Sequence, residues 1–143
     1  MKKQIIFVVL MTVCFCGVAS AYTKPNKATM NNIEKAWRKV IWVETKSGTH
    51  PDTYKKRKQG DWGVAQITPI LVKDVNRIQK KKYTHSDSLN DKLAKQMFII
   101  YLTNYARNSS VEKMCRLWHR GPSKKYQYDQ YGDKYWKSCQ GAK

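Results

Sequence analysis

Glu44 is the acidic residue whose position best fits a chemical role. It stands seven residues after Trp37, and seven steps along a helix return to nearly the same side. The carboxyl group therefore falls on the apolar stripe that also holds Ile33 and Val40. Burial against aromatic side chains would raise the pKa of such a carboxyl group, as a general acid at neutral pH requires. An ion pair with one of the many lysines is the alternative explanation.

A second carboxyl group, Asp61, follows Glu44 by 17 residues and directly precedes Trp62. Asp61 is therefore a second candidate for an acid that acts beside Glu44. A turn aspartate after Gly60 is the alternative, because Gly and Asp are both common in turns.

Several polar and aromatic side chains are candidates for binding a ligand. Gln66 offers an amide that can bind a polar group of a ligand or orient a carboxyl group. Trp62, Trp118, Tyr101 and Tyr105 could stack on the rings of a ligand, although the helical spacing of Tyr101 favours a place in the core. The sequence has no zinc-ligand spacing, no phosphate-binding glycine loop and no nucleophile elbow, so we expect no metal ion and no other cofactor.

The helix that must position Glu44 is predicted to end just after it. Asn31 and Glu34 have the spacing of a capping box in front of the apolar stripe, and residues 45–48 break the helical pattern. Residues 46–66 are rich in glycine, proline, aspartate and lysine, which is typical of an irregular or small β region.

Further helices are predicted wherever a capping residue precedes apolar residues at helical spacing. They follow Thr68 with Pro69 in the first position, Ser88 with Asp91, and Ser110, and a last one lies near Tyr131 to Cys139. The sequence therefore predicts a mainly α fold of the α+β kind, with one helical domain over residues 22–143.

The N-terminus and the charge indicate where the protein works. Residues 1–21 combine two lysines, an apolar stretch of about 14 residues and a final Ala-Ser-Ala, as in a secretory signal peptide cleaved before Tyr22. The whole chain has 28 Lys and Arg against 10 Asp and Glu, a net charge of +18. This charge favours polyanionic partners. For a secreted or periplasmic monomer, peptidoglycan or another anionic glycan is a more plausible partner than nucleic acid.

Cys115 and Cys139 are the two cysteines that would remain after removal of the signal peptide. Because exported chains meet oxidising conditions, the sequence predicts one disulfide between them. His119 follows Cys115 by four residues, a spacing that raises the question of a Cys/His peptidase pair. The predicted disulfide speaks against that role.

The order of these elements resembles the lysozyme-like superfamily, which includes lytic transglycosylases and the c-type and goose-type lysozymes. The resemblance rests on Glu44 at a helix end, on residues 63–67 (Gly-Val-Ala-Gln-Ile), on residues 121–122 (Gly-Pro) and on residues 135–136 (Tyr-Trp). It covers roughly residues 33–137. It implies that Glu44 is the catalytic acid and that the stretch containing Gln66 lines a sugar cleft.

Three positions matter in the comparison with the family. In c-type lysozymes a second carboxylate occupies the place of Asp61. Enzymes that cleave glycosidic bonds with retention hold two carboxyl groups about 5 Å apart, one as the acid and one as the nucleophile or stabiliser, so the resemblance makes Asp61 the candidate for the second role. Thr45 stands where a serine often follows the catalytic glutamate, and it keeps the hydroxyl group. His119 and Arg120 stand where an asparagine commonly precedes the Gly-Pro turn, so the polar contact expected there is altered.

The sequence therefore predicts an exported enzyme that cleaves the β-1,4 bond between N-acetylmuramic acid and N-acetylglucosamine in peptidoglycan. Glu44 would be its general acid and base. The Gly-Pro and Tyr-Trp elements resemble the lytic transglycosylase branch, whereas Asp61 keeps the hydrolytic muramidase branch open. The altered turn at His119 supports an alternative, a catalytically silent cationic protein that binds the cell wall or another surface.

Overall fold

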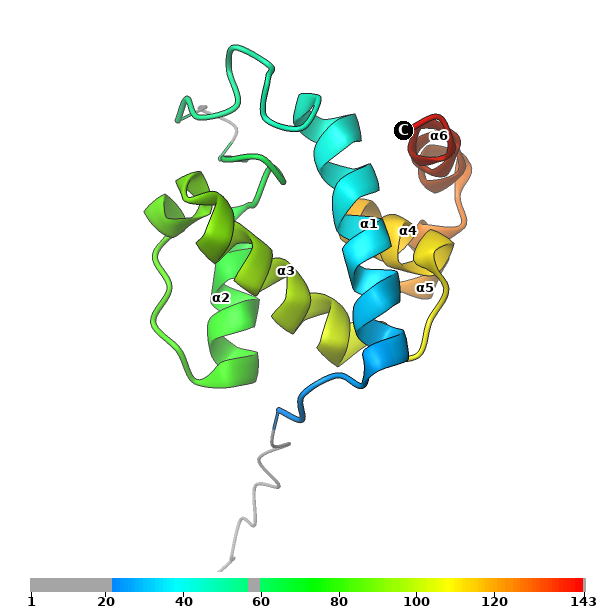
Figure 1. The fold of residues 1–143 in the computed structure, drawn as a ribbon, viewed down its shortest axis with the longest axis horizontal. Helices are drawn as coiled ribbons and strands as arrows, with labels where there is room; N and C mark the ends of the chain where they lie inside the picture. Colours follow the sequence, from blue (N-terminus) through cyan, green and yellow to red (C-terminus); the bar gives the residue numbers. More distant parts are fainter. Residues whose placement is uncertain (1–21, 57–59, 143) are drawn as a thin grey trace, which may run out of the picture.

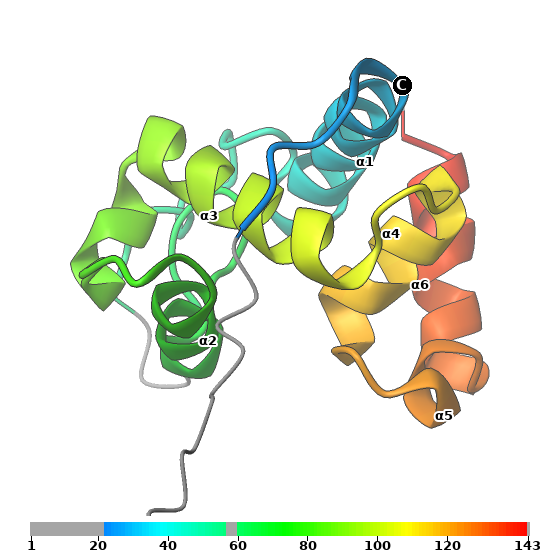
Figure 2. The same cartoon turned by 90° about the horizontal axis from the view of Figure 1, so that it is seen from below.

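The computed structural model describes residues 22–56 and 60–142, so the predicted signal peptide, residues 1–21, lies outside the described residues. Figures 1 and 2 show α2 and α3 on one side of the molecule and α4, α5 and α6 on the other. The elements are α1 (Lys27–Thr45), α2 (Pro69–Gln79), a short 3-10 helix η1 (His85–Leu89), α3 (Asp91–Tyr105), α4 (Val111–Arg120), α5 (Lys124–Gln127) and α6 (Gln130–Gln140).

Two of the predicted helix starts are confirmed. The Thr68 hydroxyl accepts a hydrogen bond from the Leu71 backbone amide at 3.3 Å, and Pro69 occupies the first turn of α2. The Ser110 hydroxyl accepts from the Lys113 amide at 3.3 Å at the start of α4. In both cases the cap satisfies a backbone donor that the helix leaves without a partner.

Two other predicted caps are wrong. Helix α1 begins at Lys27, and its cap is Asn26 rather than Asn31. The additional turn forms because Thr29 is buried and its hydroxyl donates a hydrogen bond of 2.8 Å to the side chain of Asn108. Helix α3 is capped by Asn90, because Ser88 already belongs to η1.

The core lies where α1, α3 and α4 meet. The Trp37 and Phe98 rings pack edge to face with centroids 5.1 Å apart, and Phe98 in turn lies 4.6 Å from Trp118. Aliphatic side chains with no exposed surface fill the space around these rings: Ile33, Val40, Ile67, Val75, Met97 and Leu102. The predicted mainly helical fold is confirmed.

The region predicted to be irregular or β is almost entirely irregular. The described residues of 46–66 form turns, bends and irregular chain, and the only pairing among them is an antiparallel bridge between Trp62 and Ile67. Its two backbone hydrogen bonds measure 3.1 and 2.9 Å. The chain turns back too sharply for a strand, because Gly63 and Gln66 both adopt positive φ angles. The α+β part of the prediction is therefore not borne out within the described residues.

The predicted disulfide is also absent. Cys115 on α4 and Cys139 on α6 are both buried and both free thiols. A hydrogen bond with Cys139, and then burial, raise the pKa of Cys115, so its sulfur keeps the proton. Other contacts fasten α6 to the rest of the domain, among them a hydrogen bond of 2.9 Å from the Lys39 ammonium to the Cys139 carbonyl oxygen.

Within the part of the chain that the structure describes, no helix combines the length and the apolar character needed to cross a membrane.

Candidate functional site

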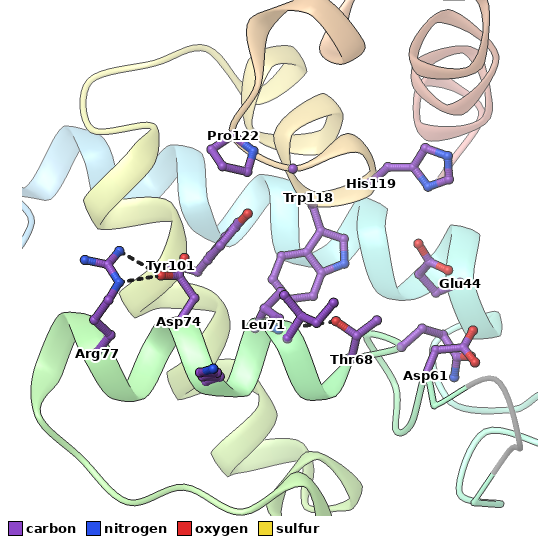
Figure 3. A pocket seen from close by; sticks show the side chains of 14 residues that line it. Glu44, Asp61, Thr68, Leu71, Asp74, Arg77, Tyr101, Trp118, His119 and Pro122 are labelled. Atoms are coloured by element: carbon purple, nitrogen blue, oxygen red, sulfur yellow. Dashed lines mark hydrogen bonds and ion pairs between the residues drawn. The ribbon is translucent and has the colours of Figure 1, made fainter.

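A pocket of about 820 Å³ runs along α2 to the C-terminal ends of α1 and α4 (Figure 3). Six residues singled out from the sequence line it: Glu44, Asp61, Gln66, Tyr101, Trp118 and His119. The other lining residues are Thr68, Ile70, Leu71, Lys73, Asp74, Arg77, Gly121 and Pro122. The fold thus brings together side chains that are spread over most of the sequence.

Glu44 lies in the last turn of α1 and is half-buried at one end of the pocket. The Tyr135 hydroxyl on α6 donates a hydrogen bond of 2.7 Å to Glu44 Oε1. Burial and the nearby Glu44 carboxylate both raise the pKa of Tyr135, so the phenol stays protonated and remains a donor. This contact fixes the orientation of the Glu44 carboxyl group.

His119 packs against Tyr135, the residue that binds the Glu44 carboxyl group. Its ring stacks on the Tyr135 ring with centroids 4.2 Å apart and an interplanar angle of 6°. Desolvation, and then the neighbouring Arg120 charge, lower the pKa of His119, while Asp129 opposes the shift. The imidazole is therefore predominantly neutral at pH 7. His119 thus contacts the tyrosine that holds Glu44.

Asp61 and Gln66 each have a side-chain oxygen atom that could accept a hydrogen bond from a ligand. Figure 3 shows the Asp61 side chain at the same end of the pocket as Glu44. Asp61 Oδ1 and Gln66 Oε1 are buried, and neither has a hydrogen-bond partner among the described residues. The Gln66 amide is anchored at its other atom, since Nε2 donates to the Gly63 carbonyl oxygen at 2.8 Å. Buried acceptors of this kind suit a ligand that brings N–H or O–H donors.

Tyr101 and Trp118 form the floor of the pocket. They are 5% and 8% exposed and pack edge to face with centroids 5.9 Å apart. The Trp118 indole donates a hydrogen bond of 3.1 Å to the Ala65 carbonyl oxygen. Both rings are therefore core residues that also border the pocket, and they offer a ligand their edges rather than an open stacking surface.

Thr45 and Trp62, two further residues singled out from the sequence, are not among the residues that line this pocket. Thr45 is 1% exposed, and its hydroxyl donates to the Val64 carbonyl oxygen at 2.9 Å. This bond ties the end of α1 to the loop that carries Asp61. The Trp62 ring instead stacks on His85, with centroids 3.8 Å apart.

The far end of the pocket carries a polar group that the sequence analysis did not identify. Arg77 bonds to Asp74 Oδ1 at 2.7 Å, and the Tyr105 hydroxyl donates to Asp74 Oδ2 at 2.7 Å. Figure 3 shows Asp74 and Arg77 at the end opposite to Glu44. The spacing of Asp74 and Arg77 on one helix predicts their ion pair. No local pattern predicts the contact with Tyr105, which comes from another helix.

Comparisons with family models, with curated proteins and with solved structures give no match to this chain. In residues 22–56 and 60–142, no group of three or more His, Cys, Asp or Glu side chains is placed to hold a metal ion.

Proposed function

We propose that the pocket binds a peptidoglycan strand and cleaves its β-1,4 bond between N-acetylmuramic acid and N-acetylglucosamine. The observation that carries this proposal is the Glu44 carboxyl group, half-buried in the pocket and held by the Tyr135 hydroxyl at 2.7 Å. A cavity of about 820 Å³ is large enough for a ligand of several rings. The net charge of +18 favours binding to a wall that carries carboxylates and phosphates.

Glu44 would act first as the acid and then as the base. In the first step it protonates the glycosidic oxygen, and the bond between that oxygen and the anomeric carbon breaks. In the second step the Glu44 carboxylate takes the proton of the 6-hydroxyl group of the same muramic acid. That oxygen then attacks the anomeric carbon, which closes a 1,6-anhydro ring and returns Glu44 to its protonated form.

Tyr135 and His119 would position the acid without touching the reacting atoms. The Tyr135 phenol keeps its proton, and the His119 ring packed on it is predominantly neutral at pH 7. Neither side chain therefore adds a full positive charge next to Glu44. Gln66 Oε1 and Asp61 Oδ1 are buried acceptors near the acid that would receive donors of the sugar.

Tyr135→Phe tests the positioning role. We expect kcat on purified wall to fall about tenfold with little change in KM, because only the hydrogen bond that orients Glu44 is lost. Tyr54→Phe is the matched control, since Tyr54 is exposed and is not among the residues that line the pocket, and the activity of this variant should equal that of the wild type. Equal kcat values for the wild type and Tyr135→Phe would refute the positioning role.

Asp61→Asn separates the two branches of the mechanism. If Glu44 alone supplies acid and base, we expect the rate of wall cleavage to fall by at most about tenfold, because only one contact with the ligand is altered. The products should then carry anhydro ends. Mass analysis of the fragments, together with the initial rate, measures both. A rate loss as large as that of Glu44→Gln, combined with reducing-end products, would assign Asp61 as the nucleophile of a muramidase.

The loss of turbidity of a suspension of purified wall tests the proposal against its main alternative. An enzyme clears the suspension at substoichiometric protein concentration. A catalytically silent wall-binding protein sediments with the wall and leaves the turbidity unchanged.

A further inference from the structure

Three exposed tyrosines gather where α5 joins α6. Of the five large apolar side chains that are exposed in the described part of the chain, Tyr126, Tyr128 and Tyr131 lie within six residues of one another. Their exposed fractions are 47%, 57% and 58%. We call these three side chains the tyrosine face; Figure 2 shows α5 and α6 side by side at one end of the molecule. Exposed tyrosines in such a group are typical of a binding surface.

Two arginines hold these rings in place. The Arg120 guanidinium lies 5.7 Å from the centre of the Tyr126 ring and 5.4 Å from that of Tyr131. The Arg116 guanidinium lies 4.9 Å from the centre of the Tyr128 ring. Contacts between a cation and a ring at these distances are attractive.

The arginines are themselves fixed by acids. Arg120 forms an ion pair with Asp129, and Arg116, which is 6% exposed, pairs with Asp133 at 2.7 Å. The tyrosine face is therefore arranged before any partner arrives, which lowers the entropy cost of binding.

The charge around the face indicates an acidic partner. Since the two arginines are already paired with carboxylates, the uncompensated charge comes from exposed lysines, among them Lys124 and Lys125. Neither of these two forms an ion pair within the described residues, and the Lys125 ammonium lies 5.7 Å from the centre of the Tyr126 ring. A lipid surface fits the face less well, because residues 121–142 contain no Leu, Ile, Val, Met or Phe, and their one Trp, Trp136, packs partly buried against the core.

The face is joined directly to the rim of the pocket. Gly121 and Pro122 line the pocket, and α5 begins two residues later. The Gln127 amide donates to the Gly121 carbonyl oxygen at 3.0 Å, and Arg120 Nε donates to the Tyr126 carbonyl oxygen at 3.2 Å. The rim of the pocket and α5 are therefore neighbouring parts of the structure.

We infer that the tyrosine face is a second carbohydrate-binding surface, which holds an acidic glycan strand outside the pocket. The C–H faces of pyranose rings stack on tyrosine rings, and the acidic substituents of the strand pair with Lys124 and Lys125. The choice of peptidoglycan as the strand rests on the proposed function. The existence of a glycan surface rests on the tyrosine face itself.

Sedimentation with insoluble purified peptidoglycan tests this inference in protein that carries Glu44→Gln, so that binding is measured without cleavage. We expect replacement of Tyr126, Tyr128 and Tyr131 by Ala to weaken binding about tenfold or more, and replacement of all three by Phe to retain it. Tyr54→Ala is the matched control, because Tyr54 is 49% exposed on another part of the surface. Lys124→Ala combined with Lys125→Ala should weaken binding and reduce its dependence on salt.

Cleavage of a short soluble glycan by protein with an intact Glu44 separates the two proposals. The triple Ala variant should cleave it at the wild-type rate, since the fragment does not extend beyond the pocket. If the wild type cleaves no glycan but wall binding still depends on the tyrosines, the proposed function fails and the glycan surface stands. Unchanged wall binding by the triple Ala variant overturns the inference. The inference is also overturned if the triple Ala variant loses binding to anionic lipid vesicles but still binds the wall.

Discussion

Glu44→Gln is expected to lower the rate of wall cleavage by about 1,000-fold or more, because the amide can neither give nor take the proton that both steps require. Glutamine has nearly the same shape, and its carbonyl oxygen can still accept the 2.7 Å hydrogen bond from Tyr135. The fold and the affinity for the wall should therefore be retained. The measurement is the initial rate of turbidity loss, together with sedimentation of the variant with intact wall.

Glu34→Gln is the control for this prediction. Glu34 lies on the same helix but does not line the pocket. Its carboxylate forms an ion pair with the Lys95 ammonium, at a distance of 2.8 Å. Loss of a partly exposed ion pair costs little, so this variant should cleave at the wild-type rate. If the Glu44→Gln variant cleaves the wall at the wild-type rate, the proposed mechanism is wrong.

Gly63→Ala is expected to destabilise the domain by about 3 kcal/mol or more and to lower Tm by about 10 °C. A Cβ atom at this position would stand 1.8 Å from the Ser88 carbonyl oxygen, which belongs to the backbone and cannot move independently. The φ angle of +76° adds strain for any residue with a side chain. Thermal unfolding followed by circular dichroism measures the change.

Gly60→Ala separates the clash from the backbone strain. Gly60 has a similar φ angle of +79°, but a Cβ atom there would meet only the Pro69 ring at 3.5 Å, an ordinary contact. We expect this variant to lose about 1 kcal/mol. Equal Tm values for the two variants would show that the clash of the added Cβ atom with Ser88 does not determine the loss of stability in Gly63→Ala.

The sequence predicts those parts of the site that depend on local patterns. Thr68 and Ser110 are short side chains placed just before apolar residues at helical spacing, and both cap helices as expected. Glu44 stands on an apolar stripe, and that stripe directs it toward the interior at the end of α1. For the first helix the sequence predicts Asn31 as the cap, whereas the contact of the buried Thr29 with Asn108 favours an earlier start, which Asn26 caps.

The contacts that shape the site join residues far apart in the sequence. Tyr135 reaches Glu44 across 91 residues, and no spacing rule relates the two. The stacking of His119 on Tyr135 depends on how α4 and α6 pack, so the sequence presents His119 only as a departure from a family pattern. The disulfide prediction failed for a similar reason, because an oxidising compartment permits a bond that the packing of these two helices does not form.

The masses of the fragments that the wild-type protein releases from purified peptidoglycan test the central claim most directly. The proposed function predicts soluble muropeptides that end in 1,6-anhydro-N-acetylmuramic acid, formed at substoichiometric protein concentration and absent with Glu44→Gln. Folded wild-type protein that sediments with the wall and releases no fragment would contradict the claim and leave a wall-binding protein.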